Sequence, residues 1–138
     1  MEYNFLIENY RSSDEAMSTL LYLTEYFDRQ GRPQEAQRWF QQAERYFEEM
    51  AAIGAGTIVE AKALRFKADL YQQKNEWGKA AEILLGLFDK YPHAEIGRQA
   101  LLKASAMYRQ KLNDRAAADS LIEVLKAVIV QVEPGWES

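Results

Sequence analysis

The 138-residue chain contains no cysteine and a single histidine. The lack of thiols excludes disulfide bonds, thiol catalysis and zinc–thiolate sites. The histidine, His93, has no second nitrogen or sulfur ligand with which to bind a transition metal, and no serine stands in a nucleophile-elbow motif beside which it could act as a base. We therefore expect no catalytic site, no metal and no cofactor, and we place His93 in an exposed connection.

Proline and glycine are also scarce, with three prolines and seven glycines. A fold with many turns needs more of these residues, whereas long helices need few. No stretch approaches the roughly 18 uncharged apolar residues of a membrane-spanning helix, so we expect no membrane insertion. The net charge of −4 argues against a protein that binds nucleic acid through its phosphates.

Apolar residues recur at three- and four-residue spacing along most of the chain, which predicts helices. Turn-forming residues divide this pattern into about seven helices. The expected helix ends are marked by Gly31, Pro33, Gly54, Gly56, Asn75, Pro92 and Asn113. Thr57 and Glu60 have the spacing of a capping box, and Asn75 is the expected cap of the helix that follows it. The fold class is therefore predicted to be all-α.

The helices also show an internal repeat, because a small residue follows the turn in each of three copies. These residues are Ala36, Ala80 and Ala117, and a large apolar residue stands four positions beyond each of them. Two antiparallel helices approach closely only where the facing side chain is small. The pattern therefore predicts helix pairs that pack at these alanines.

The middle copy carries the repeat most clearly, with Tyr71, Ala80, Leu84, Leu87 and Pro92 at its key positions. This pattern resembles the tetratricopeptide repeat (TPR), and the Tyr-Pro ending is similar to the repeats of bacterial envelope proteins of the BamD and TolA-binding type. The resemblance implies antiparallel helix pairs stacked as a right-handed superhelix. The implied single domain spans residues 1–132, with a half repeat at 2–11, repeats at about 14–53, 57–92 and 94–130, and a tail at 133–138.

The same resemblance implies a function, since the first helix of each TPR pair lines a concave groove that binds another protein or a peptide. Carrying the groove positions over to this chain gives Leu21, Glu25, Arg29, Lys62, Arg65, Asp69, Gln72, Leu102 and Arg109. We expect these basic and amide side chains to hold carboxylates and backbone carbonyls of the partner. The alternative is that they form ordinary solvated helix faces.

The last helix has a wider apolar stripe than packing on one neighbour requires, and the stripe includes Leu125, Val128, Ile129 and Val132. One explanation is an assembly face for a second copy of the chain or for flanking repeats. The other is deep packing against two neighbouring helices. A structural or oligomerisation unit that assembles through its terminal helices, with no groove ligand, is therefore the alternative to a binding scaffold.

The compartment stays open on sequence alone. Met1 through Phe5 show neither the basic start nor the apolar run of a signal peptide. The opening half repeat is either a natural cap of the domain or part of a longer array of repeats, and we expect the second. A periplasmic or envelope location is favoured if that array belongs to an exported protein, and a cytoplasmic one otherwise.

Overall fold

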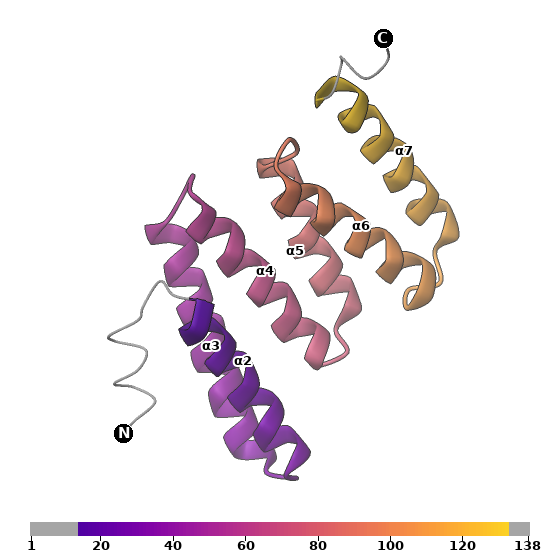
Figure 1. Cartoon of the computed structure of the whole chain (residues 1–138). Coiled ribbons are helices and arrows are strands. Elements are labelled where there is room, and N and C mark those ends of the chain that lie inside the picture. Colours follow the sequence, from indigo (N-terminus) through magenta and orange to yellow (C-terminus); the bar gives the residue numbers. More distant parts are fainter. Residues whose placement is uncertain (1–13, 133–138) are drawn as a thin grey trace. The chain divides into compact units, whose positions relative to one another are not determined.

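The computed structural model describes residues 14–132, and over this range the chain is helical and holds no strand (Figure 1). The all-α prediction is confirmed for these residues. The helices are α2 (Asp14–Arg29), α3 (Pro33–Ile53), α4 (Ile58–Gln73), α5 (Trp77–Lys90), α6 (Glu95–Gln110) and α7 (Arg115–Val132). The expected opening helix at 2–11 and the tail at 133–138 lie outside the described residues.

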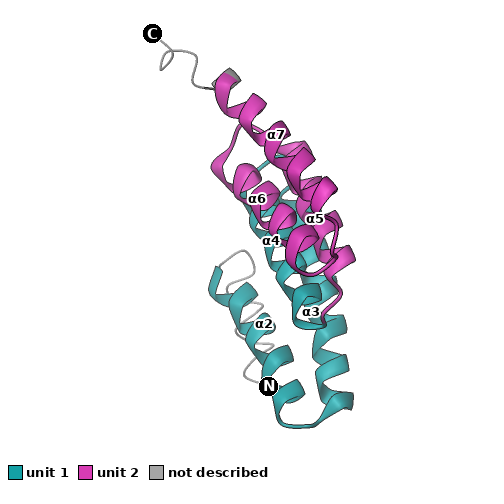
Figure 2. Ribbon diagram, turned by 90° about the vertical axis from the view of Figure 1, so that its right-hand side faces the viewer, with its two compact units in different colours: residues 1–74 teal, residues 75–138 magenta. Residues whose placement is uncertain are grey.

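The chain divides into two compact units, residues 1–74 and residues 75–138 (Figure 2). In the described part of unit 1, α2, α3 and α4 each contact the other two. In unit 2, α6 contacts both α5 and α7. The boundary between Lys74 and Asn75 falls inside the expected repeat at 57–92, so the pairing of α4 with α5 stays a prediction.

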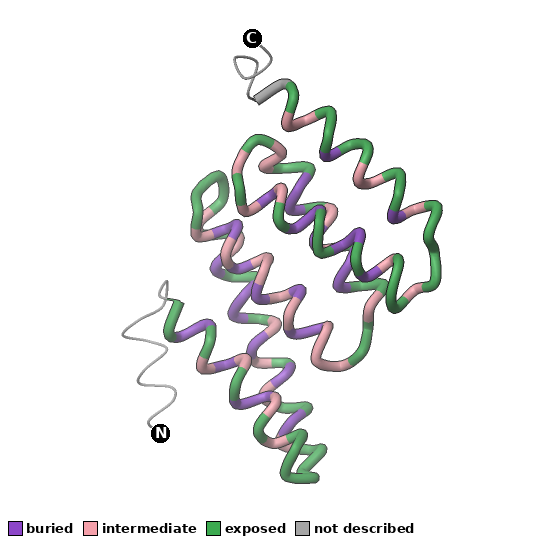
Figure 3. The backbone as a smooth tube through the Cα atoms, turned by 45° about the vertical axis from the view of Figure 1, so that its right-hand side comes forward, coloured by how far each residue is buried: buried purple, intermediate pink, exposed green. Residues whose placement is uncertain are grey.

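The core of unit 1 lies between its three helices and is rich in aromatic side chains. Phe47 on α3 is fully buried and stacks on Phe66 of α4, with ring centroids 5.8 Å apart. Phe40 meets Tyr71 edge to face at 5.4 Å. The buried segments recur on the facing sides of the helices in Figure 3, as the three- and four-residue spacing predicts.

The core of unit 2 contains fully buried leucines on α5 and α6, namely Leu84, Leu87 and Leu101. Ala80, at the start of α5, is also buried, as the repeat pattern predicts. In the third copy the prediction is displaced by one residue, because Ala118 is fully buried and Ala117 is only half-buried. Asp114 accepts a hydrogen bond from the Ala117 amide at 3.0 Å, and this start of α7 turns Ala118 toward α6.

Most of the expected helix ends are confirmed. Gly31 follows α2 with a φ of 69°, a conformation that suits glycine, and Pro33 is the first residue of α3. The prediction for Asn75 was wrong in its role. Asn75 adopts the left-handed conformation with a φ of 61° just after α4, while Glu76 precedes α5 without a side-chain cap. Asparagine tolerates this conformation better than most residues, so Asn75 terminates α4 and does not cap the start of α5.

The capping box at the start of α4 is present. Thr57 Oγ1 accepts a hydrogen bond from the Val59 amide at 3.2 Å, and Glu60 Oε1 accepts one from the Gly56 amide at 3.0 Å. The usual capping box bonds the glutamate to the cap residue's own amide. Here the glutamate reaches one residue further back, so it fixes the glycine turn as well as the helix.

Thr57→Ala is expected to lower the free energy of unfolding by about 1 kcal/mol, because the Val59 amide at the start of α4 would lose its hydrogen-bond acceptor. Urea unfolding followed by circular dichroism measures this change. Thr19→Ala is the control, since the Thr19 hydroxyl bonds only the Glu15 carbonyl within α2. A loss at Thr57 no larger than the loss at Thr19 would show that the cap contributes little.

Candidate partner-binding strip on helices α2 and α4

Helix α4 is enclosed on most of its circumference. Apart from Ile58, each of its residues is buried or half-buried, because α2 and α3 both pack against it. Four half-buried polar side chains, Lys62, Arg65, Asp69 and Gln72, recur at three- and four-residue intervals and so lie along one line. This line coincides with the positions that the repeat resemblance assigned to the groove.

Helix α2 runs beside this line in parallel register. Lys62 Nζ lies 3.2 Å from a carboxylate oxygen of Asp14 near the start of both helices. Near their ends, Gln73 Nε2 donates to the Leu21 carbonyl at 3.2 Å and to Glu25 Oε2 at 3.3 Å. The Lys62–Asp14 and Gln73–Glu25 links both join residues 48 positions apart, so the helices are parallel and in step.

The structure therefore brings together seven of the nine expected groove residues in unit 1. We call them the α2–α4 strip: Leu21, Glu25, Arg29, Lys62, Arg65, Asp69 and Gln72.

The three cations of the strip differ in whether they already form an ion pair within the chain. Arg29 pairs with Glu25 at 2.6 Å, and Lys62 pairs with Asp14. Arg65 lies over the ring of Phe66, with its guanidinium carbon 5.4 Å from the centroid, and has no carboxylate partner within residues 14–132. The ring fixes the guanidinium while its hydrogen-bond donors stay available. Arg65 is therefore the strip residue best placed to bind an incoming carboxylate.

Two amide oxygens of the strip region lack hydrogen-bond donors. Gln72 Oε1 and Gln73 Oε1 are shielded from solvent, and neither receives a hydrogen bond from the described part of the chain. An unmet buried acceptor costs about 1–3 kcal/mol, so such groups are rare in finished cores. The Gln73 amide cannot be reversed, because its nitrogen already donates to two oxygens.

A pocket of about 240 Å³ lies at the end of the strip where α2 and α4 finish. It is lined by Thr24, Glu25, Asp28, Arg29, Gln73 and Lys74. Lys74 leans over the ring of Phe40, with its nitrogen 5.4 Å from the centroid. Sequence reasoning did not find Thr24 and Lys74, because the pocket arises from two helix ends that meet only in the fold.

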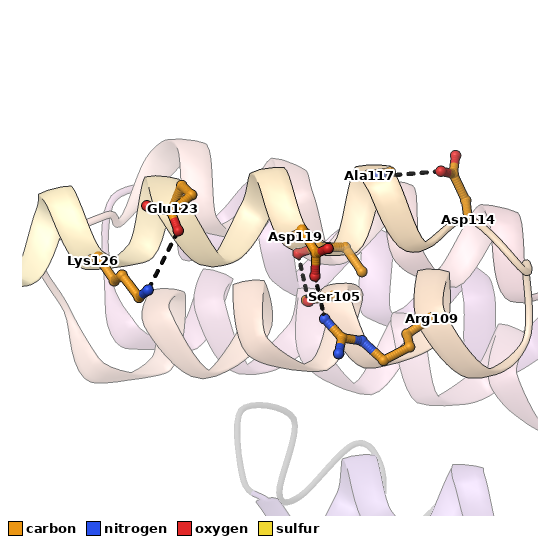
Figure 4. A network of polar contacts seen from close by, with 8 residues as sticks. Ser105, Arg109, Asp114, Ala117, Asp119, Glu123 and Lys126 are labelled. Carbon is orange, nitrogen blue, oxygen red and sulfur yellow. Dashed lines mark hydrogen bonds and ion pairs between the residues drawn. The ribbon is translucent and has the colours of Figure 1, made fainter.

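The two remaining groove residues, Leu102 and Arg109, lie on α6 in unit 2. Leu102 is 49% exposed, as a partner contact requires. Arg109 instead pairs with Asp119 of α7 at 2.7 Å, beside the buried bond from Ser105 to the Ala118 carbonyl (Figure 4). Arg109 thus links two helices of its own unit. That it shares one groove with the strip stays a prediction.

Part of the apolar stripe of α7 packs against the core of unit 2. Leu125 is buried against Phe88 and Leu101, and Val128 and Ile129 are partly buried against the same cluster. Val132 ends the helix, but its side chain lies outside the described set. Val124 and Val130 of the same helix are 44% and 43% exposed, so both explanations of the stripe stay predictions.

No three histidine or acidic side chains gather in positions to hold a metal ion anywhere in residues 14–132. His93 is exposed in the connection between α5 and α6, where the sequence placed it. The same range includes no helix with the length and apolarity needed to cross a membrane.

Comparison with protein-family models, with curated proteins and with solved structures gave no match for this chain. The TPR resemblance therefore rests on the residues quoted for it.

Proposed function

We propose that this chain is a non-catalytic interaction scaffold that holds a segment of another protein along the α2–α4 strip. The observation that carries the proposal is the single line of half-buried polar side chains on α4, which includes Arg65, a guanidinium with no carboxylate partner within residues 14–132. Because Arg65 has no carboxylate partner among the described residues, its hydrogen-bond donors stay available for a carboxylate of the partner.

The chemistry of the strip suits an extended peptide. Arg65 would bind a carboxylate, and Leu21 would supply an apolar contact. From Lys62 to Gln72 the strip is about 15 Å long at about 1.5 Å per residue. An extended segment of about five residues, at about 3.3 Å each, would cover it.

We further propose that the helix pairs form a TPR-like right-handed superhelix, in which the first helix of each pair faces the partner. The parallel contact of α2 with α4, and the packing of α3 against both, supports this assignment for unit 1. Leu102 on α6 of unit 2, which is 49% exposed, stays a proposed partner contact of its own unit. The partner we propose is a protein or a peptide.

Capture of proteins from a native lysate of the source cells tests this function. Arg65→Glu reverses the charge of the strip cation that has no carboxylate partner among residues 14–132, so we expect the captured protein to be lost or reduced at least tenfold. Such a loss corresponds to about 1.4 kcal/mol or more, in the range of one charge-assisted hydrogen bond.

Arg45→Glu is the matched control for this experiment, because Arg45 is exposed on α3 and lies outside the strip. Both variants must first show the parent's helical signal and melting temperature. Equal capture by the parent, Arg65→Glu and Arg45→Glu would overturn the strip as the binding site.

A further inference from the structure

We propose that Ile58 is an apolar contact site at the start of the α2–α4 strip, and that the bound segment places a large apolar side chain on it, three positions away from the acidic residue that binds Arg65. This inference rests on the proposed function of the strip and names the residue pattern of its partner.

Ile58 lies on the same line of α4 as the polar residues of the strip. It precedes Lys62 by four residues and Arg65 by seven, so about one and two turns of helix separate them. Among the residues of α4 only Ile58 is exposed, and its exposed fraction is 56%. The line of strip residues therefore continues beyond Lys62 to an exposed apolar side chain.

The sequence around Ile58 favours an apolar ligand. The segment from Met50 to Val59 contains no charged residue. The next charge along the same face of α4 is Lys62, which is already paired with Asp14 at 3.2 Å. An apolar side chain that docks on Ile58 would therefore bury apolar surface without taking water from an unpaired lysine.

The start of α4 is fixed by hydrogen bonds on both sides of Ile58. Thr57 Oγ1 accepts a hydrogen bond from the Val59 amide at 3.2 Å, and Glu60 Oε1 accepts one from the Gly56 amide at 3.0 Å. The backbone that carries Ile58 is thus ordered before a partner arrives. Binding to an ordered site costs less conformational entropy than binding to one that must first be ordered.

The distance along α4 sets the residue spacing in the partner. The seven residues from Ile58 to Arg65 correspond to about 10 Å of helix. In a polyproline II segment, residues three positions apart lie on the same side and about 9 Å apart. In a β-strand, residues on one side are two or four positions apart, at about 7 or 13 Å. The closest fit is a polyproline II segment with an apolar and an acidic residue three positions apart.

Selection from a display library of random peptides, with the whole chain as bait, tests this pattern directly. We expect the enriched peptides to carry leucine, isoleucine, methionine or phenylalanine three positions from aspartate or glutamate. With Ile58→Ser as bait, the apolar preference should be lost and the acidic preference kept. A synthetic enriched peptide should bind the parent chain about fivefold more weakly when alanine replaces its apolar residue, as expected for a partly buried side chain.

Ile53→Ser is the matched control, because Ile53 is 71% exposed and ends α3, so it lies off the line on α4. This variant should select the same pattern as the parent. Equal loss of the apolar preference with Ile53→Ser and Ile58→Ser would indicate general apolar adhesion at the turn and would overturn the Ile58 site. A lower melting temperature for Ile58→Ser than for Ile53→Ser would also overturn it, because Ile58 would then be covered by the chain itself.

Arg65→Glu as bait separates this inference from the proposed function, since it should remove the acidic preference. Peptides that depend on Arg65 but show no apolar preference at that spacing would overturn the Ile58 site alone. Peptides enriched equally by the parent and by Arg65→Glu, or no enriched peptides at all, would overturn the strip proposal and the Ile58 site together.

Discussion

Replacing Gly97 by alanine is expected to lower the free energy of unfolding by about 1–3 kcal/mol, or more if the backbone cannot adjust. Gly97 is buried near the start of α6, where the chain returns from the Tyr91–Ala94 connection. A Cβ added there would lie 1.9 Å from the Tyr91 carbonyl oxygen and 2.8 Å from its carbon. Both are backbone atoms, so relief requires a shift of the connection or of the helix. Urea unfolding measures the loss.

Gly86→Ala is the matched control, because it makes the same chemical change in an open position. Gly86 is exposed inside α5, and nothing lies within 4 Å of an added Cβ. Alanine is a better helix former than glycine by up to about 1 kcal/mol, so this variant should be more stable than the parent. Two variants that shift stability in the same direction would contradict the close approach of Tyr91 to α6.

Leu101→Ala is expected to cost about 2–5 kcal/mol, because it removes a fully buried side chain from the core of unit 2. Leu101 is 1% exposed and packs in one cluster with Phe88 and Leu125. The lost stability has two parts: the burial free energy of the deleted carbons, and the cost of the cavity left between α5, α6 and α7. Chemical unfolding followed by helical signal gives its size.

Leu102→Ala, one residue further along α6, supplies the comparison. Leu102 is 49% exposed, so its truncation should change stability by no more than about 0.5 kcal/mol. The variant then serves a second purpose, because a folded chain without Leu102 tests whether this leucine contributes to partner capture. Similar losses for the two leucines would mean that α6 is rotated from the orientation described.

The helices themselves follow from local chemistry in the sequence. Gly31 follows the end of α2 because glycine adopts a positive φ without strain. Pro33 begins α3 because its fixed φ suits the first residue of a helix. The Thr57 cap is also local, since its partners lie within four residues. The polar line on α4 could be predicted for a related reason, because helical spacing fixes which residues share a face.

Features that depend on contacts between helices were less predictable. Ala118 replaces Ala117 at the α6–α7 contact because Asp114 sets the start of α7, and one residue of displacement is about 100° of rotation. The pairing of Arg109 with Asp119 joins two helices, so the sequence alone gave no sign of it. The pocket beyond Gln73 needs the parallel register of α2 and α4, which only the fold supplies.

The central claim is that a partner protein binds along the α2–α4 strip, and site-specific photo-crosslinking in the source cells tests it most directly. The photoreactive residue p-benzoylphenylalanine would replace Ser18, which is exposed and shares a helix face with Leu21 and Glu25, or Val124, which is 44% exposed on α7. The strip predicts a covalent adduct with a different protein from position 18 and none from position 124. Adducts from position 124 alone, above all with a second copy of this chain, would contradict the strip and favour assembly through the terminal helix.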